Sequence, residues 1–150
     1  RWIVPVCART AASSACTLVE GDEGRLDLAP GDWVLPNAGA SGYYRFDLDP
    51  AGWERLIAAA PGLPGEEAMV IADSAWASFE AGRAPFSTVL AAMRALAGHQ
   101  ERLAAVFIPG RIGGLTQTAL SAADRSAYGA LINSLFRDRL SAMGVNLARG

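Results

Sequence analysis

The chain has 150 residues, 51% of them apolar, and a formal net charge of −2 at pH 7. This length and apolar content suffice for a folded core in one domain or two small ones. The near-neutral charge argues against a nucleic-acid-binding surface or an anionic-membrane surface, and no run of about 18 apolar residues offers a membrane span.

The first 49 residues carry the pattern of short strands separated by turns. Apolar and β-branched residues predict strands at 2–10, 16–20, 25–28, 33–35 and 43–48. Turns rich in glycine, aspartate and proline separate them at 21–24 and 29–31. We therefore expect a small antiparallel β-sandwich-like part at the start of the chain.

The two cysteines, Cys7 and Cys16, flank a predicted turn at 11–14. If 2–9 and 15–20 pair as a hairpin, the cysteines face each other closely enough for a disulfide. Two buried or half-buried thiols are the alternative. A bridge would favour a periplasmic or secreted protein, whereas free thiols would leave a cytoplasmic one.

The segment 32–46 is the most distinctive in the chain. Trp33 begins a short strand that Pro36 ends, because proline lacks a backbone donor. Asn37 and the glycines that follow favour a turn. Beyond the turn a new strand begins. Tyr43 and Arg45 would share one of its faces, and Tyr44 and Phe46 the other.

From residue 49 the pattern becomes helical. Asp49 can cap a helix that begins at Pro50, and further helices are predicted at 64–82, 85–98, 99–107 and 121–143. Pro109-Gly110 is expected to end the fourth helix, and residues 111–114 to form a flexible connector. Because short loops place successive helices antiparallel, we expect an α+β chain that ends in a solenoid-like helical stack.

Four residues within these helices have a specific expected environment. Trp76 and Phe79 are expected in the core. Asp73 lies on an otherwise apolar helix and needs a partner such as Arg45 or a backbone amide if it is buried. His99, at a helix start, is expected to be solvated or to cap the helix.

Taken together, three segments resemble the M1 family of zinc aminopeptidases, over about residues 1–105. The first is a Trp-x-x-Pro strand, the second a tryptophan, asparagine and Gly-Tyr-Tyr-Arg segment, and the third a helix with an aspartate and a terminal glycine. The matching residues are Trp2, Pro5, Trp33, Asn37, Gly42, Tyr43, Tyr44, Arg45, Asp73 and Gly82. The resemblance implies an incomplete β-sandwich at 1–49 and a truncated helical domain at 50–150.

The family's catalytic zinc site is missing from this sequence. That site needs an H-E-x-x-H motif and a distant glutamate, whereas this chain has a single histidine, His99, and no such motif. We therefore assign no catalytic, metal or cofactor-binding residue here and expect the chain alone to be inactive. The resemblance places zinc in the full-length parent, a metallopeptidase that removes N-terminal amino acids from peptides.

Within such a parent, the resemblance implies a structural spacer and a helical domain that caps the catalytic cleft. The implied partners are the catalytic domain and, in the full-length enzyme, the peptide substrate. A stand-alone module that binds a protein or peptide is the alternative. If the ends are cut, we expect self-association through the edge of the 2–10 strand or through the last helix.

Overall fold

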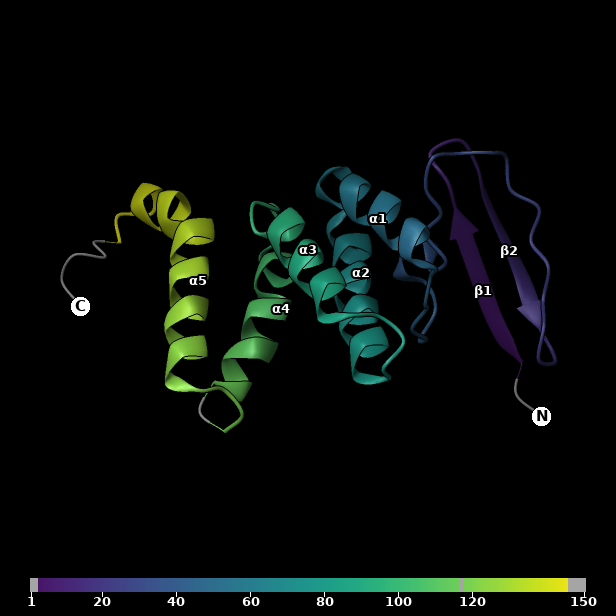
Figure 1. Cartoon of the computed structure of the whole chain (residues 1–150). Coiled ribbons are helices and arrows are strands. Elements are labelled where there is room, and N and C mark those ends of the chain that lie inside the picture. The colour runs from purple at the N-terminus through teal and green to yellow at the C-terminus, as the bar shows by residue number, and fades with distance from the viewer. Residues whose placement is uncertain (1–2, 117, 146–150) are drawn as a thin grey trace.

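The structure is a computed structural model that describes residues 3–116 and 118–145. Within these residues two strands come first and five α-helices follow, with two short 3-10 helices. The order is β1 (Val4–Arg9), β2 (Ser14–Val19), η1 (Ala38–Ala40), α1 (Pro50–Ala59), η2 (Ala60–Gly62), α2 (Gly65–Glu80), α3 (Phe86–Leu96), α4 (Arg102–Leu115) and α5 (Ala122–Ala142). The hairpin lies at one end of the molecule and α5 at the other (Figure 1).

Strands β1 and β2 form the predicted antiparallel hairpin. Thr10 holds its turn, because the hydroxyl Oγ1 accepts hydrogen bonds from the backbone N–H groups of Ala12 and Ser13. The register places Cys7 directly opposite Cys16, and a disulfide joins the two. The predicted bridge is therefore confirmed, and the free-thiol alternative is wrong.

The β-sandwich expected at 1–49 is not formed by the described residues, and the strands predicted at 25–28, 33–35 and 43–48 are wrong. Leu35 makes one isolated bridge with Arg9, and Pro36 follows it. The backbone of Phe46 bonds to α2 instead of a neighbouring strand. Its N–H donates to Ser74 Oγ, and its carbonyl accepts from Ser78 Oγ, both at 3.4 Å.

Side-chain caps begin α1 and α5, at Asp49 as predicted and at Ser121. Asp49 Oδ1 accepts a hydrogen bond from Gly52 N at 2.6 Å at the start of α1, and Ser121 caps α5 in the same way through Asp124 N. Gly82 ends α2 with a φ of +69°, a left-handed conformation that glycine adopts without a Cβ clash.

Helix α2 lies at the centre of the core and contacts α3 and α4. The side chains of Ile71, Met93 and Ile108 are almost completely buried there. Trp76 is also buried, and Phe79 packs edge-on against it with ring centroids 5.8 Å apart. The predicted core role of this aromatic pair is confirmed.

Helix α4 continues through Pro109, so the predicted stop and the flexible connector at 111–114 are wrong. An internal proline costs a helix about 3 kcal/mol. Ile108 and Ile112, one turn apart, are both buried in the core, and Tyr128 Oη donates a hydrogen bond to the Pro109 carbonyl at 2.7 Å. We infer that this burial offsets the cost of the proline.

Removing the disulfide should weaken the fold measurably. We expect Cys7→Ser combined with Cys16→Ser to lower the free energy of unfolding by about 2.5 kcal/mol, because the bridge closes a short loop in the unfolded chain. Chemical denaturation with and without a reductant measures this. Reduction should destabilise the wild type and leave the double variant unchanged, and equal stability of the oxidised wild type and the variant would contradict the expectation.

Candidate functional site

A buried carboxylate joins the hairpin, the following loop and α2. Glu67, in the first turn of α2, is 3% exposed. It accepts hydrogen bonds from Arg9 Nε at 2.8 Å, from Arg9 Nη2, and from Gly39 N at 2.8 Å. The guanidinium of Arg9 also lies over the ring of Trp33, 5.0 Å from its centroid. One carboxylate therefore fixes three segments that are distant in sequence.

The surroundings of Glu67 favour its charged form. Burial by itself would raise the pKa of Glu67, but hydrogen bonds from Arg9 and Gly39, together with the charge of Arg9, hold it below its ordinary value. The hydrogen bond to Glu67 raises the pKa of Arg9, against the opposing effect of burial. Both groups are therefore ionised at neutral pH.

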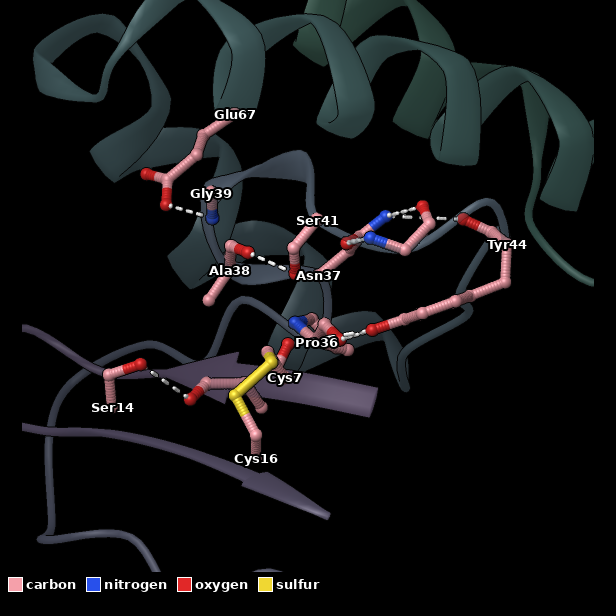
Figure 2. The surroundings of a disulfide bond; sticks show 12 residues. Cys7, Ser14, Cys16, Pro36, Asn37, Ala38, Gly39, Ser41, Tyr44 and Glu67 are labelled. Carbon is pink, nitrogen blue, oxygen red and sulfur yellow. Dashed lines mark hydrogen bonds between the residues drawn. A yellow bond between two sulfur atoms is a disulfide. The ribbon is translucent and has the colours of Figure 1, made fainter. Parts of the chain in front are cut away.

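Asn37 organises the loop between Pro36 and Tyr44. It is 1% exposed, its Nδ2 donates to the carbonyls of Gly42 at 2.8 Å and Tyr44 at 3.4 Å, and its Oδ1 accepts from Gly42 N at 2.9 Å. Figure 2 shows this loop between the disulfide-bridged hairpin and Glu67. The Asn37 side chain thus binds the backbone groups of this turn, as a neighbouring strand would bind those of a hairpin strand.

The hydroxyl of Tyr44 fastens the loop to the hairpin. It donates to the Pro36 carbonyl at 2.8 Å and lies 3.5 Å from the carbonyl of Cys7, one of the two bridged cysteines (Figure 2). Burial raises the pKa of Tyr44, although the contact with Cys7 opposes that rise.

Arg45 and Asp73 form an ion pair beside this loop. Arg45 Nε donates to Asp73 Oδ2 at 2.8 Å, and Nη2 donates to Oδ1 at 3.3 Å. The expected partner of Asp73 is therefore confirmed. A pocket of about 300 Å³ lies between this pair and Tyr43, whose side chain is fully exposed.

The remaining residues of the predicted motif are not brought to this site. Pro5 is exposed in β1, and Gly82 ends α2. The backbone of Arg9 bonds to Leu35 on the edge of β1 that faces away from β2, and the carbonyl of Cys7 lies on the same edge. Pro5 therefore lies on that edge as well, where it has no N–H to offer. Trp2 lies outside the described residues.

Sequence reasoning missed Arg9 and Glu67 as partners. A signal was available, because Glu67 shares one face of α2 with the buried residues Ile71, Ala75 and Ser78. A carboxylate on a buried stripe requires a cation or amide donors.

His99 is buried rather than solvated, and Glu101 rather than His99 caps the start of α4, so neither expectation for His99 holds. Its Nδ1 accepts a hydrogen bond from Glu101 N at 3.0 Å, which leaves the ring proton on Nε2 to donate to the Leu63 carbonyl at 3.0 Å. Both ring nitrogens are thus engaged. Within residues 3–116 and 118–145, no cluster of three or more histidine, cysteine, aspartate or glutamate side chains suits a metal ion.

No helix among the described residues is both long and apolar enough to cross a bilayer.

Glu67 and its neighbour Glu66 form a matched pair for mutation, since Glu66 is exposed in the same helical turn. We expect Glu67→Gln to lower the free energy of unfolding by about 3 kcal/mol, because it leaves Arg9 without its counter-charge. Glu66→Gln should change it by about 0.5 kcal/mol or less. Urea denaturation of both variants tests this, and similar losses would show that Glu67 carries no special role.

The same carboxylate makes stability pH-dependent. Its pKa is lowered by folding, so the unfolded state takes up the proton first. The stabilisation by Glu67 should be complete above its ordinary pKa of 4.5 and decline as the pH falls further. The stability difference between wild type and Glu67→Gln, measured at pH 7 and in acid, should shrink in acid. A constant difference would contradict the ion pair.

Comparison with known proteins places this arrangement in a family. No curated protein matches the chain, but the family model of the ERAP1-like C-terminal domain matches residues 33–149. The matched part begins at Trp33 and includes the Asn37 loop, Glu67 and all five α-helices, while the hairpin precedes it. The chain therefore belongs to the ERAP1-like C-terminal domain family, whose domain is found in M1 family aminopeptidases.

Proposed function

We propose that this chain is the non-catalytic C-terminal portion of an M1-like zinc aminopeptidase. Its N-terminal part would act as a structural spacer and its helices as a cap over the catalytic cleft. The family match carries this proposal. The described residues supply no metal-binding group, so the zinc and the attack of its bound water would belong to the parent's catalytic domain.

The contacts that Glu67 makes with the hairpin and with residues 33–49, here called the joint, support a spacer role. A spacer must hold its neighbours in a fixed orientation, and the Arg9–Glu67–Gly39 contacts with the Tyr44–Pro36 hydrogen bond do this without mobile linkers. We propose residues 1–49 as the spacer part and 50–150 as the helical part. Residues 33–49 belong to the joint, since they contact both the hairpin and α2.

The hairpin supports a proposal for the parent's compartment. Structural disulfides persist in oxidising environments, and Cys7 and Cys16 are bridged. We therefore propose an extracellular or periplasmic parent.

The chain alone should have no aminopeptidase activity on chromogenic amino-acid amides, and purified protein should contain no stoichiometric zinc, because one engaged histidine cannot build a two-histidine site. Activity assays and metal analysis check both. Activity that survives repurification and is lost on mutating a residue of this chain would overturn the proposal.

The capping role is tested in the full-length parent. The coding sequence upstream should contain H-E-x-x-H followed by a distant glutamate, and its absence would favour a stand-alone interaction module.

Glu67→Gln in the parent should loosen the joint and change the relative hydrolysis of long peptides and amino-acid amides, while Glu66→Gln should not. An unchanged ratio in a destabilised Glu67→Gln enzyme would contradict the cap.

A further inference from the structure

An apolar groove runs between α1 and α3. A pocket of about 320 Å³ lies there, with the buried Trp53 and Ile57 as its floor. Alanines at 58, 91 and 95 leave room for larger side chains from outside. A second pocket of about 800 Å³ shares Pro61 and Ala95 with the first and extends it past the ends of both helices. The two form one continuous depression.

The charged residues that line this depression are all acidic. Glu54 lines the α1–α3 pocket, and Glu66 and Glu101 line its extension. Among the described residues that line the two pockets, none is an arginine or lysine. By charge complementarity, the groove suits an apolar segment that carries cations on its flanks.

Helix α5 has such a segment. It packs on the core through Tyr128, Leu131, Ile132 and Leu135. At about 100° per residue, Phe136, Leu140 and Met143 lie on a neighbouring stripe, turned by roughly a quarter of a revolution from that face. Met143 is 70% exposed, and Phe136 and Leu140 are only half-buried.

Arginines flank the stripe on both sides, Arg137 on one and Arg139 on the other. The stripe spans about 11 Å at 1.5 Å per residue, and the ten and eleven residues of α1 and α3 extend over about 15 Å. The helix segment therefore fits the groove in length, in apolar character and in charge.

The charge of the whole chain has the same polarity. Residues 1–80 contain twelve acidic and five basic residues, a net charge of −7, and residues 81–150 contain three acidic and eight basic residues, a net charge of +5. Glu54 and Glu66 on the groove rim belong to the negative half, and α5 belongs to the positive half. Two copies would therefore attract each other head to tail.

The groove and the stripe of one copy do not meet. Tyr128 Oη binds the Pro109 carbonyl and Arg139 Nη1 binds the His99 carbonyl at 2.9 Å, which holds α5 beside α4 and the α3–α4 loop. No α5 residue lines either pocket. Figure 1 shows α3 and α4 between α5 and α1.

We propose that the α5 stripe of one copy docks in the α1–α3 groove of a second copy, with Arg137 placed against the acidic rim. This inference goes beyond the proposed function and does not depend on it. The interface is heterologous, since it joins two different surfaces, so each bound pair leaves one groove and one stripe free. Association therefore proceeds past the dimer.

Two charge reversals test the interface, Glu54→Arg in the groove and Arg137→Glu on α5. Both side chains are exposed, so the fold should tolerate each change, which thermal unfolding checks. Sedimentation velocity over a concentration series, at low and high salt, should show wild-type mass rising without a plateau at the dimer. Each reversal should weaken association by about tenfold or more, because it places like charges together, and high salt should weaken the wild type.

Sedimentation velocity of an equimolar mixture of the two variants is the decisive experiment. In the mixture, the Arg137 of one variant meets the native groove of the other, and the reversed helix meets the reversed groove. Association should therefore return to about the wild-type level. A monomer at every concentration, association that survives both reversals (as pairing through the β1 edge would), or a mixture that stays dissociated would each overturn the proposal.

Discussion

The buried charge of Glu67 is the constraint on which the rest of the structure depends. An isolated carboxylate cannot be taken out of water at acceptable cost, so its position requires donors from outside its own helix. Arg9 supplies two and Gly39 one. The orientation of the hairpin and the conformation of the loop are thereby fixed by the same atom group, and the two must be correct together.

Local signals in the sequence were sufficient for the hairpin and for the starts of α1 and α5. Caps such as Asp49 and Ser121 act on donors within their own first turn, and the spacing of Cys7 and Cys16 around a turn sets their register. These features depend on residues only a few positions apart. The sequence therefore predicted them, and it left the bridge between the cysteines as one of two alternatives.

The errors arose where distant partners decide the outcome. Alternating polar and apolar residues at 25–28 and 43–48 indicate which face of an extended segment is apolar, but not whether a partner strand lies beside it. The backbone of Phe46 is bound by Ser74 and Ser78 of α2 instead of by a strand. Pro109 predicted a helix end, yet the burial of Ile108 and Ile112 carries the helix past it. In the site, Arg45 and Asp73 were paired correctly, whereas Glu67 and Arg9 were missed because 58 residues separate them.

Helix α5 has 21 residues but no fully buried side chain, and this gives the molecule an uneven resistance to opening. Undocking α5 exposes little apolar surface, so its free-energy cost is small compared with that of disrupting α2. Amide hydrogens in α5 are therefore expected to exchange with solvent through a local fluctuation, and those of α2 only when the whole core opens. Helix α5 would then open as a separate cooperative unit while the contacts around Glu67 stay intact.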